Sequence, residues 1–302
     1  MSLRHALLAT LVAVIWGLNF IAIRFGVDDV PPLLFLAIRF LLVSIPAIFI
    51  LKPPAIGWKN IVLIGTFLSL GQFTLLYLSM SLGMPPGLAS LLLQTQVVLT
   101  VIVAAIVLRE RPTRTQIVGI VVGMAGLAVV VVSHGSVAPW LPLVIILLAA
   151  LSWAIGNVLA RRAKAASGLS LVVWSGAVVP IPALALSLLI ETPPVVVDAL
   201  SHFTLNAVLS TLYTVIFASL VGYGIWNTLL ARYPASAVVP FTLLVPIVGI
   251  LSAWLVLGEL PTVLELVGGA VMLAGLAIAV VTWGPRRSVS PIARQLRDEV
   301  LE

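Results

Sequence analysis

Cysteine is absent from this 302-residue sequence, and charged residues are scarce. The missing thiols exclude disulfides, thiolate metal sites and thiol catalysis. Charged residues make up 9% of the chain, whereas a soluble domain carries about 25%. The three histidines, His5, His134 and His202, lie far apart in the sequence. Because metal ligands recur at short spacings, we expect neither a metal nor another cofactor.

Hydrophobic residues make up 62% of the chain, more apolar surface than a water-soluble fold can bury. A membrane-spanning helix needs about 20 apolar residues, and ten such runs can be read along the sequence. They cover residues 6–25, 33–51, 59–80, 86–108, 115–133, 140–161, 169–190, 203–230, 235–257 and 262–283. We therefore predict an all-α integral membrane protein with ten transmembrane helices.

One stretch of the sequence occurs twice. Residues 108–127 read LRERPTRTQIVGIVVGMAGL and residues 257–276 read LGELPTVLELVGGAVMLAGL, which are identical at ten of twenty positions with an offset of 149. The repeat predicts two five-helix halves, residues 1–135 and 136–284, followed by a cytoplasmic tail at 285–302. Because five is odd, the second half should be inverted in the membrane, as in many transporter folds.

The basic residues predict which side faces the cytoplasm. With both termini inside, every Lys and Arg except Arg24 and Arg39 falls in a cytoplasmic segment, which is the positive-inside pattern. The acidic residues Asp28, Asp29, Glu191, Asp198, Glu259 and Glu265 fall on or near the outer side. The formal net charge of +6 therefore indicates topology, and we expect no nucleic-acid partner.

Polar and aromatic side chains within the spans are the candidate substrate-binding residues, since such groups must face protein or water. They are Trp16, Asn19, Gln72, Tyr77, Gln94, Gln96, Trp153, Asn157, Tyr223, Trp226 and Asn227. Alternatively, Asn and Gln only bond a neighbouring helix, and Trp and Tyr only anchor at the membrane interface. Gln94 and Gln96 point to different sides of a helix, so only one is expected to face a lumen.

Arg39 is the one cation well inside a predicted span. It is expected either to reach Asp28, Asp29 or helix-end carbonyls as a structural tie, or to contact a substrate carboxylate. No Asp or Glu falls near a predicted midplane, so a carboxylate proton relay is not expected. A neutral cavity of this kind suits a zwitterion, carried without an obligatory proton gradient.

Gly119 and Gly123 form a GxxxG pattern that is typical of close helix packing. The pattern fits a contact within the fold or at a weak homodimer, so the chain is expected to be a monomer or a weak dimer among membrane lipid. A membrane enzyme would need a nucleophile, metal or acid–base pair at midplane, and a channel would need a continuous polar helix face. The sequence favours neither, and we predict a transporter.

Several runs resemble a known family. They are WGLNF at 16–20, Pro31-Pro32, Arg39-Phe40, GMPPGLASLLLQTQ at 83–96, SWAIGN at 152–157, VGYGIWNTLLARY at 221–233 and LLVPIVG at 243–249. These runs resemble the EamA family of the drug/metabolite transporter superfamily. The chain looks most like its O-acetylserine/cysteine exporters, and the aromatic amino acid exporters are more distant.

The resemblance implies a ten-helix exporter of amino acids and related metabolites, located in the bacterial inner membrane. It also implies a central cavity formed mainly by the third, fourth, eighth and ninth spans. It does not fix the substrate, so nucleosides or drugs stay open as alternatives.

Overall fold

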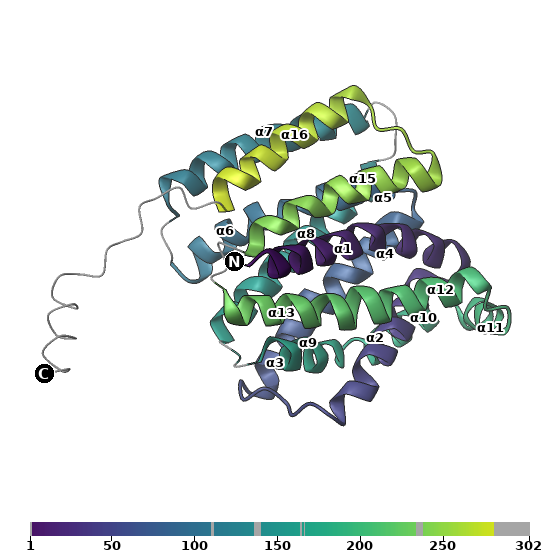
Figure 1. Cartoon of the computed structure of the whole chain (residues 1–302). Helices are drawn as coiled ribbons and strands as arrows, with labels where there is room; N and C mark the ends of the chain where they lie inside the picture. The colour runs from purple at the N-terminus through teal and green to yellow at the C-terminus, as the bar shows by residue number, and fades with distance from the viewer. Residues whose placement is uncertain are drawn as a thin grey trace, which may run out of the picture.

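The computed structural model describes residues 2–109, 112–135, 140–163, 165, 167–233 and 238–280, and all the regular structure there is helical (Figure 1). Seven of its helical segments are long and apolar enough to cross a membrane, and three shorter apolar helices accompany them. Each of the ten predicted spans overlaps one of these segments. The prediction of an all-helical integral membrane protein is therefore confirmed. The predicted tail at 285–302 lies outside the described residues.

The elements follow each other in chain order. Residues 3–135 form α1 (Leu3–Asp29), α2 (Pro32–Ile48), α3 (Trp58–Ile64), η1 (Gly65–Gly71), α4 (Gln72–Ser81), α5 (Pro86–Leu92), α6 (Thr95–Val107) and α7 (Arg114–Gly135). Residues 140–280 form α8 (Trp140–Ala163), α9 (Gly168–Gly176), α10 (Pro180–Ile190), α11 (Pro193–Ser201), α12 (Leu205–Leu212), η2 (Tyr213–Val221), α13 (Gly222–Arg232), η3 (Val239–Leu243), α15 (Leu244–Leu257) and α16 (Val263–Val280).

Prolines mark where several of these helices begin. Pro32, Pro86, Pro180 and Pro193 open α2, α5, α10 and α11. The first turn of a helix has no intrahelical acceptor for its N–H groups, so the missing proline N–H costs little there. Pro180 also separates α10 from α9, which turns one predicted span into two helices.

Two spans contain a π-helix at matching places. The elements η1 and η2 are both π-helices, and the repeat offset of 149 carries residues 65–71 of η1 onto 214–220 within η2. A π-helix shifts backbone bonding from i→i−4 to i→i−5 and is frequent at functional sites. The two halves of the chain thus share a backbone irregularity as well as a sequence motif.

Glycines bring α7 and α16 into backbone contact. A Cβ atom added to Gly119 would lie 2.6 Å from the carbonyl oxygen of Gly275, and one added to Gly126 would lie 2.6 Å from that of Gly268. The partner number in α16 falls as the number in α7 rises, so the two helices run antiparallel. Close packing of α7 against α16 within the chain therefore explains the glycine pattern.

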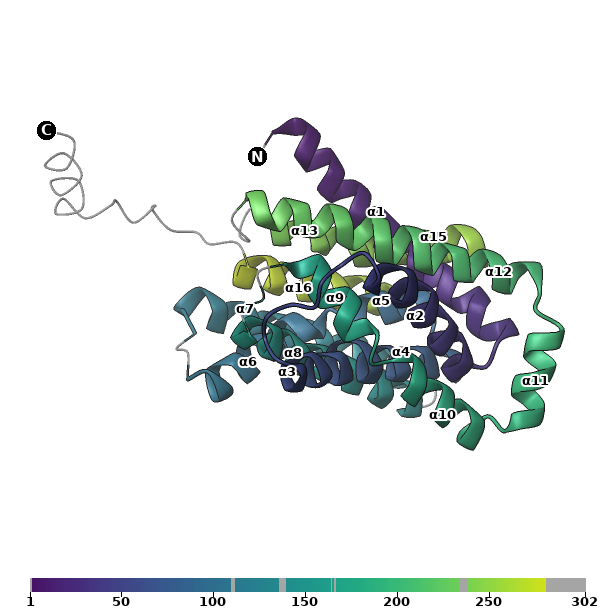
Figure 2. The ribbon, with the colours of Figure 1, turned by 90° about the horizontal axis from the view of Figure 1, so that it is seen from below.

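The first helix of each half packs mainly on the other half. Helix α1 lies against α12, η2, α13 and α15, whereas α8 lies against η1, α4 and α6 (Figures 1 and 2). Between the halves, α2 also packs on α10. The buried core is therefore shared by both halves and has no boundary between separate domains.

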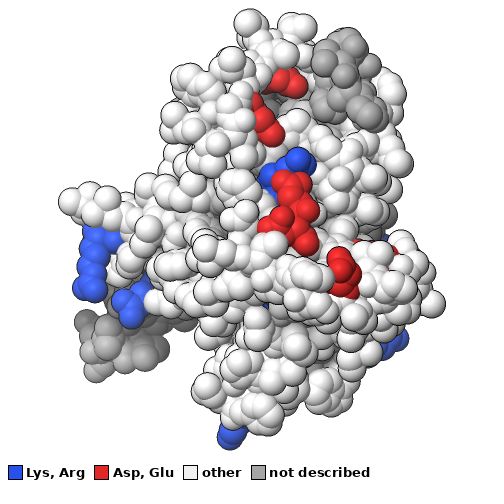
Figure 3. All heavy atoms as spheres, turned by 90° about the vertical axis from the view of Figure 1, so that its right-hand side faces the viewer, with Lys and Arg blue, Asp and Glu red and all other residues white. Residues whose placement is uncertain are grey.

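The acidic residues that the structure describes collect at one end of the helix bundle. Figure 3 shows Asp and Glu side chains gathered over the right-hand end of the view in Figure 1. There Glu191 accepts hydrogen bonds from the N–H groups of Leu33 and Leu34, at 2.7 and 3.2 Å, and so caps the start of α2. Arg24 pairs with Asp28 at 3.0 Å. The Glu191 contact joins the end of α10 to the start of α2, whereas the Arg24–Asp28 pair lies within α1.

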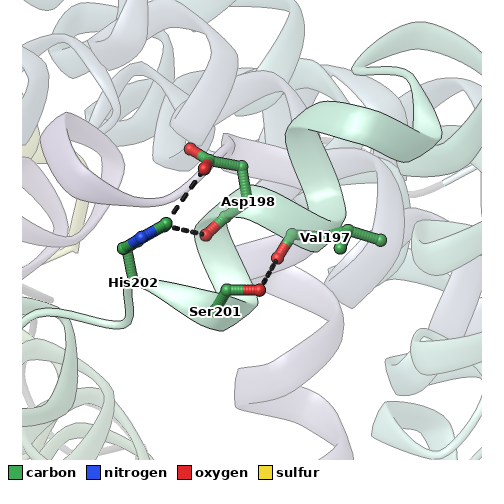
Figure 4. Close-up of polar contacts among 4 residues, drawn as sticks. All are labelled: Val197, Asp198, Ser201 and His202. Carbon is green, nitrogen blue, oxygen red and sulfur yellow. Dashed lines mark hydrogen bonds and ion pairs between the residues drawn. The ribbon is translucent and has the colours of Figure 1, made fainter.

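Helix α11 lies in a stretch that the sequence predicts as a loop. Its Val196 is buried, while Val197 is exposed. At its end His202 Nδ1 lies 3.0 Å from Asp198 Oδ1, with both side chains exposed (Figure 4). A short helix with apolar and polar exposed residues is suited to the membrane–water interface.

Large apolar side chains cover the sides of the bundle. Phe49, Ile181 and Leu255 are 83, 80 and 77% exposed. Exposure of this kind is unfavourable in water but expected where lipid tails contact the protein. The surface therefore agrees with the composition in indicating a bilayer environment.

Candidate functional site

Arg39 is the centre of a buried polar and aromatic cluster. Its side chain, on α2, is 2% exposed. Its Nη1 donates a hydrogen bond to the Tyr77 hydroxyl on α4 at 2.7 Å, and its Nη2 donates to the Ser219 hydroxyl on η2 at 3.1 Å. The guanidinium carbon lies 4.4 Å from the ring centroid of Phe73. Arg39 therefore connects the two halves of the chain.

Within the described part of the chain, Arg39 forms no ion pair with Asp or Glu. Among the described residues, Arg24 pairs with Asp28 and His202 pairs with Asp198, and Asp29 accepts a hydrogen bond from Thr204. The expected tie from Arg39 to Asp28 or Asp29 is therefore wrong. Tyr77 and Ser219 are long-range neutral partners, so Arg39 is a buried cation among uncharged groups.

Trp16 lies on α1 and extends the cluster to that helix. Its indole Nε1 donates to the carbonyl oxygen of Ala218 at 3.0 Å, the residue before Ser219 in η2. Its ring packs against those of Tyr223 and Trp226, with both centroid distances 5.2 Å. Four predicted site residues, Trp16, Tyr77, Tyr223 and Trp226, thus lie around Arg39 and η2.

Asn19 and Gln72 are also buried, at 8% and 4% exposure. Asn19 is one turn along α1 from Trp16, and residues three apart lie on one helix face. Its side-chain Oδ1 is buried without a hydrogen-bond partner, and so is the Nε of Arg39. Buried polar atoms are usually paired, so this acceptor and this donor are open to a ligand.

The remaining predicted site residues form separate contacts. Asn157 Nδ2, on α8, donates to Gln96 Oε1, on α6, at 3.0 Å. Gln94 Nε2 donates to the carbonyl oxygen of Thr242, on η3, at 3.2 Å. These bonds join helices, which is the alternative role named for Asn and Gln. The structure therefore does not gather all the predicted residues at one point.

Two further predicted residues add little to the site. Trp153 packs, partly buried, against the main hydrophobic core. Asn227 belongs to α13, but its side chain lies outside those that the structure describes. The prediction that Asn227 lines the pathway stays a prediction.

The π-helices receive side-chain donors from the opposite half. Trp16 of α1 donates to a carbonyl oxygen of η2. In the same way, Ser152 of α8 donates to the carbonyl oxygen of Phe67 in η1 at 2.8 Å. Within η2, Ser219 donates to the carbonyl oxygen of Thr214 at 2.7 Å. Side chains therefore satisfy backbone groups where the helical ladder is irregular, as membrane interiors require.

Metal binding has no evident centre in the described residues. They contain no group of three His, Cys, Asp or Glu side chains that could hold a metal ion. The cluster around Arg39 offers hydroxyl, amide, indole and guanidinium groups. Such groups can recognise a carboxylate and an ammonium, because they supply donors and acceptors in apolar surroundings.

A hollow lies at the acidic end. Its volume is about 320 Å³, and its lining includes Leu88, Ile250 and Glu259. Burial raises the pKa of the Glu259 carboxyl above its usual value, and Arg24 partly opposes this shift. Glu259 Oε2 has no hydrogen-bond partner. This hollow lies in the loop region between α15 and α16 and is separate from Arg39.

Sequence reasoning underestimated Arg39 and did not identify Ser219 as its partner. The signal for Arg39 was present, because it is the sole cation deep within a predicted span. The π-helices and their acceptor carbonyls had no signal in the residue pattern.

Known proteins resemble this chain over most of its length. The profile described as "EamA-like transporter family" matches residues 3–132 and 140–281. A "Probable amino-acid metabolite efflux pump" of Salmonella typhimurium is 40% identical over 294 residues, which cover 95% of this chain and 98% of that protein. A protein of Escherichia coli with the same description is 37% identical over 286 residues, covering 93% and 96%.

Two more comparisons extend this likeness. A "Probable terminal-alkyne amino-acid exporter" of Streptantibioticus cattleyicolor is 32% identical over 216 residues, which cover 70% of each chain. A crystal structure whose description names no activity aligns with a TM-score of 0.63 at 20% identity, covering 94% of this chain and 99% of its own. That structure shows the fold alone.

Proposed function

We propose that this chain, which belongs to the EamA-like transporter family, exports amino acids and related small metabolites across the bacterial inner membrane. Three relatives carry descriptions as amino-acid metabolite efflux pumps or an amino-acid exporter, and all three are bacterial. Membership of a transporter family also agrees with the expectation that the chain is not an enzyme.

One observation from the site carries this proposal. Two buried polar atoms have no hydrogen-bond partner: Arg39 Nε within the cluster, and Asn19 Oδ1 one turn along α1 from Trp16. A zwitterion offers the matching pair, because its ammonium donates and its carboxylate accepts. Trp16, Tyr77, Tyr223 and Trp226 would surround the rest of a small or apolar molecule.

The proposed architecture is ten transmembrane helices in two inverted five-helix repeats, with both termini in the cytoplasm. The antiparallel contact of α7 with α16 supports inversion, because these helices carry the repeated sequence. The matching π-helices and the exchanged packing of α1 and α8 also support two related halves. The gathered acidic residues (Figure 3) support an outer face at that end.

Transport would proceed by alternating access. The two halves would rock about their shared contacts and expose the cluster to each side of the membrane in turn. The Arg39–Ser219 bond joins α2 to η2, so it would open when these elements separate. The cavity needed for substrate would form as the halves part, around the residues of the cluster.

The proposed cycle needs no proton relay. The described groups bonded to Arg39 are the hydroxyls of Tyr77 and Ser219, and neither titrates near neutral pH as an ordinary side chain. Binding and release of a zwitterion therefore do not require a coupled carboxylate. We expect exchange of substrate for substrate to run at equal pH on both sides.

Counterflow tests both the function and the coupling. Proteoliposomes are loaded with one unlabelled amino acid, and uptake of the labelled form is followed with identical buffers inside and outside. We expect transient accumulation of label above its outside concentration. Uptake that begins only after a pH gradient is imposed would contradict the proposed coupling. A competition panel of amino acids and nucleosides in the same vesicles would then test the substrate class.

A further inference from the structure

We propose that Arg39 is the residue that recognises the carboxylate of the transported molecule, an inference that rests on the proposed function. The sequence left a substrate carboxylate open as one of two partners for Arg39 but did not include it among the candidate site residues. Arg39 adds a fixed positive charge to those amide and aromatic residues. An arginine keeps its proton in proteins. The charge is therefore present in every state of the transport cycle.

The first argument is the missing counter-charge. Arg39 is 2% exposed, and its hydrogen-bond partners are the neutral hydroxyls of Tyr77 and Ser219. Buried charges are ordinarily paired, because removing a charge from water is costly unless an opposite charge compensates it. No carboxylate of the described residues pairs with Arg39. An anionic ligand would supply that partner.

The second argument is the geometry of the free donor. A guanidinium has five N–H donors in a planar fork, and Arg39 directs two of its nitrogens to Tyr77 and Ser219. Its third nitrogen, Nε, is buried without a partner. A carboxylate that bridges Nε and a neighbouring Nη forms two parallel, charge-assisted hydrogen bonds. The ring of Phe73, 4.4 Å from the guanidinium carbon, covers a face of the group and leaves its edge for such a pair.

The third argument is the position of Arg39 between the halves. Residues Ala218 and Ser219 are consecutive in η2, and they accept hydrogen bonds from Trp16 and Arg39 respectively. The α1 helix that carries Trp16 also carries Asn19, whose Oδ1 is free. The π-helix η2 thus contacts Arg39, the proposed carboxylate-binding residue. It also contacts α1, the helix that carries Asn19, the proposed ammonium-binding residue. Separation at η2 would release Nη2 of Arg39 for the incoming carboxylate.

The test compares each amino acid with its primary amide, which keeps the ammonium and side chain but has no carboxylate. Counterflow is measured for both compounds with wild-type protein and with Arg39→Gln. We expect wild-type protein to prefer the amino acid by about 100-fold, the range seen when one member of a buried charge pair is removed. In R39Q the preference should fall to within about twofold, through loss of amino acid transport.

Three further variants separate charge from structure. Arg39→Lys keeps the charge and should keep part of the preference. Tyr77→Phe and Ser219→Ala each remove a neutral partner of Arg39 but leave the guanidinium, so both should retain the preference even if their rates fall. Equal losses for amino acid and amide in R39Q, with the preference unchanged, would overturn the proposal and leave a purely structural role.

The proposed function and this inference can fail separately. If wild-type vesicles carry no amino acid, the proposed function fails. If they carry amino acids but primary amides compete equally well, only the role of Arg39 fails. That competition uses wild-type protein, so it can overturn the role of Arg39 even if R39Q does not fold.

Discussion

Gly119 and Gly275 face each other across the contact between α7 and α16. A Cβ on Gly119 would lie 2.6 Å from the Gly275 carbonyl oxygen, and a Cβ on Gly275 would lie 2.7 Å from that of Gly119. The offset of 149 carries this pair onto Gly268 and Gly126, which approach each other in the same way, at 2.9 and 2.6 Å. The contact is therefore reciprocal.

This relationship predicts which glycine of the GxxxG pattern is needed. Gly119→Ala should destabilise the protein by about 1–3 kcal/mol, because the new methyl group meets backbone atoms that cannot turn aside. Gly123→Ala is the matched control in the same helix, since the nearest atom to its added Cβ lies 3.6 Å away. It should change stability by no more than about 1 kcal/mol. Thermal unfolding in detergent measures both, and equal losses would contradict the assignment.

The absence of cysteine allows a direct test of membrane orientation. His202→Cys and Lys59→Cys each introduce one exposed thiol, the first beside α11 and the second at the start of α3. On intact cells a membrane-impermeant maleimide should label H202C and not K59C. After the cells are opened, both should react. Labelling of K59C on intact cells would reverse the proposed topology.

The bond between Asn157 and Gln96 predicts a structural coupling. Asn157→Leu or Gln96→Leu alone should cost about 0.6–1.7 kcal/mol, since each leaves its partner with an unsatisfied group. The double substitution should be more stable than the sum of the two losses predicts, because both polar groups are removed together. A double-mutant cycle of thermal stability measures this difference. Additive losses would show that the two side chains act independently.

Glu259 predicts a pH dependence of stability. Burial raises the pKa of its carboxyl in the folded state above the ordinary 4.5, so the folded protein binds this proton more tightly than the unfolded chain. Stability should therefore fall as pH rises from 4.5 through the raised pKa. Glu259→Gln removes that loss and should unfold at a higher temperature than wild type at pH 7. The difference should shrink towards pH 4.5, and a constant difference would contradict the prediction.

Element positions were predictable from the sequence because the hydrocarbon core dictates long apolar runs. The run predicted at 115–133 became α7, at Arg114–Gly135, and the run at 59–80 became the segment Trp58–Ser81. Close packing of the glycine-bearing helices was also predictable from the repeated pattern, but the pairing of α7 with α16 came from the structure. Local composition alone is enough for predictions of this kind.

The partners of Arg39 were not predictable from local composition. Tyr77 and Ser219 lie 38 and 180 residues away in the sequence, so their contact depends on how the two halves pack. Asp28 and Asp29 are nearer in sequence, but Arg24 and Thr204 hold them at the helix ends. The π-helices escaped prediction because the backbone shift that defines them has no residue signature.

Both sides of the glycine contact between α7 and α16 are built from the same repeated sequence motif. A chain of half this length, inserted in both directions across a bilayer, would already carry both surfaces. Gene duplication followed by fusion would then place both surfaces in one polypeptide. The contact would no longer depend on the association of two molecules. The crossing of α7 and α16 is thus a contact that two copies of one half could form with each other, held here within a single polypeptide.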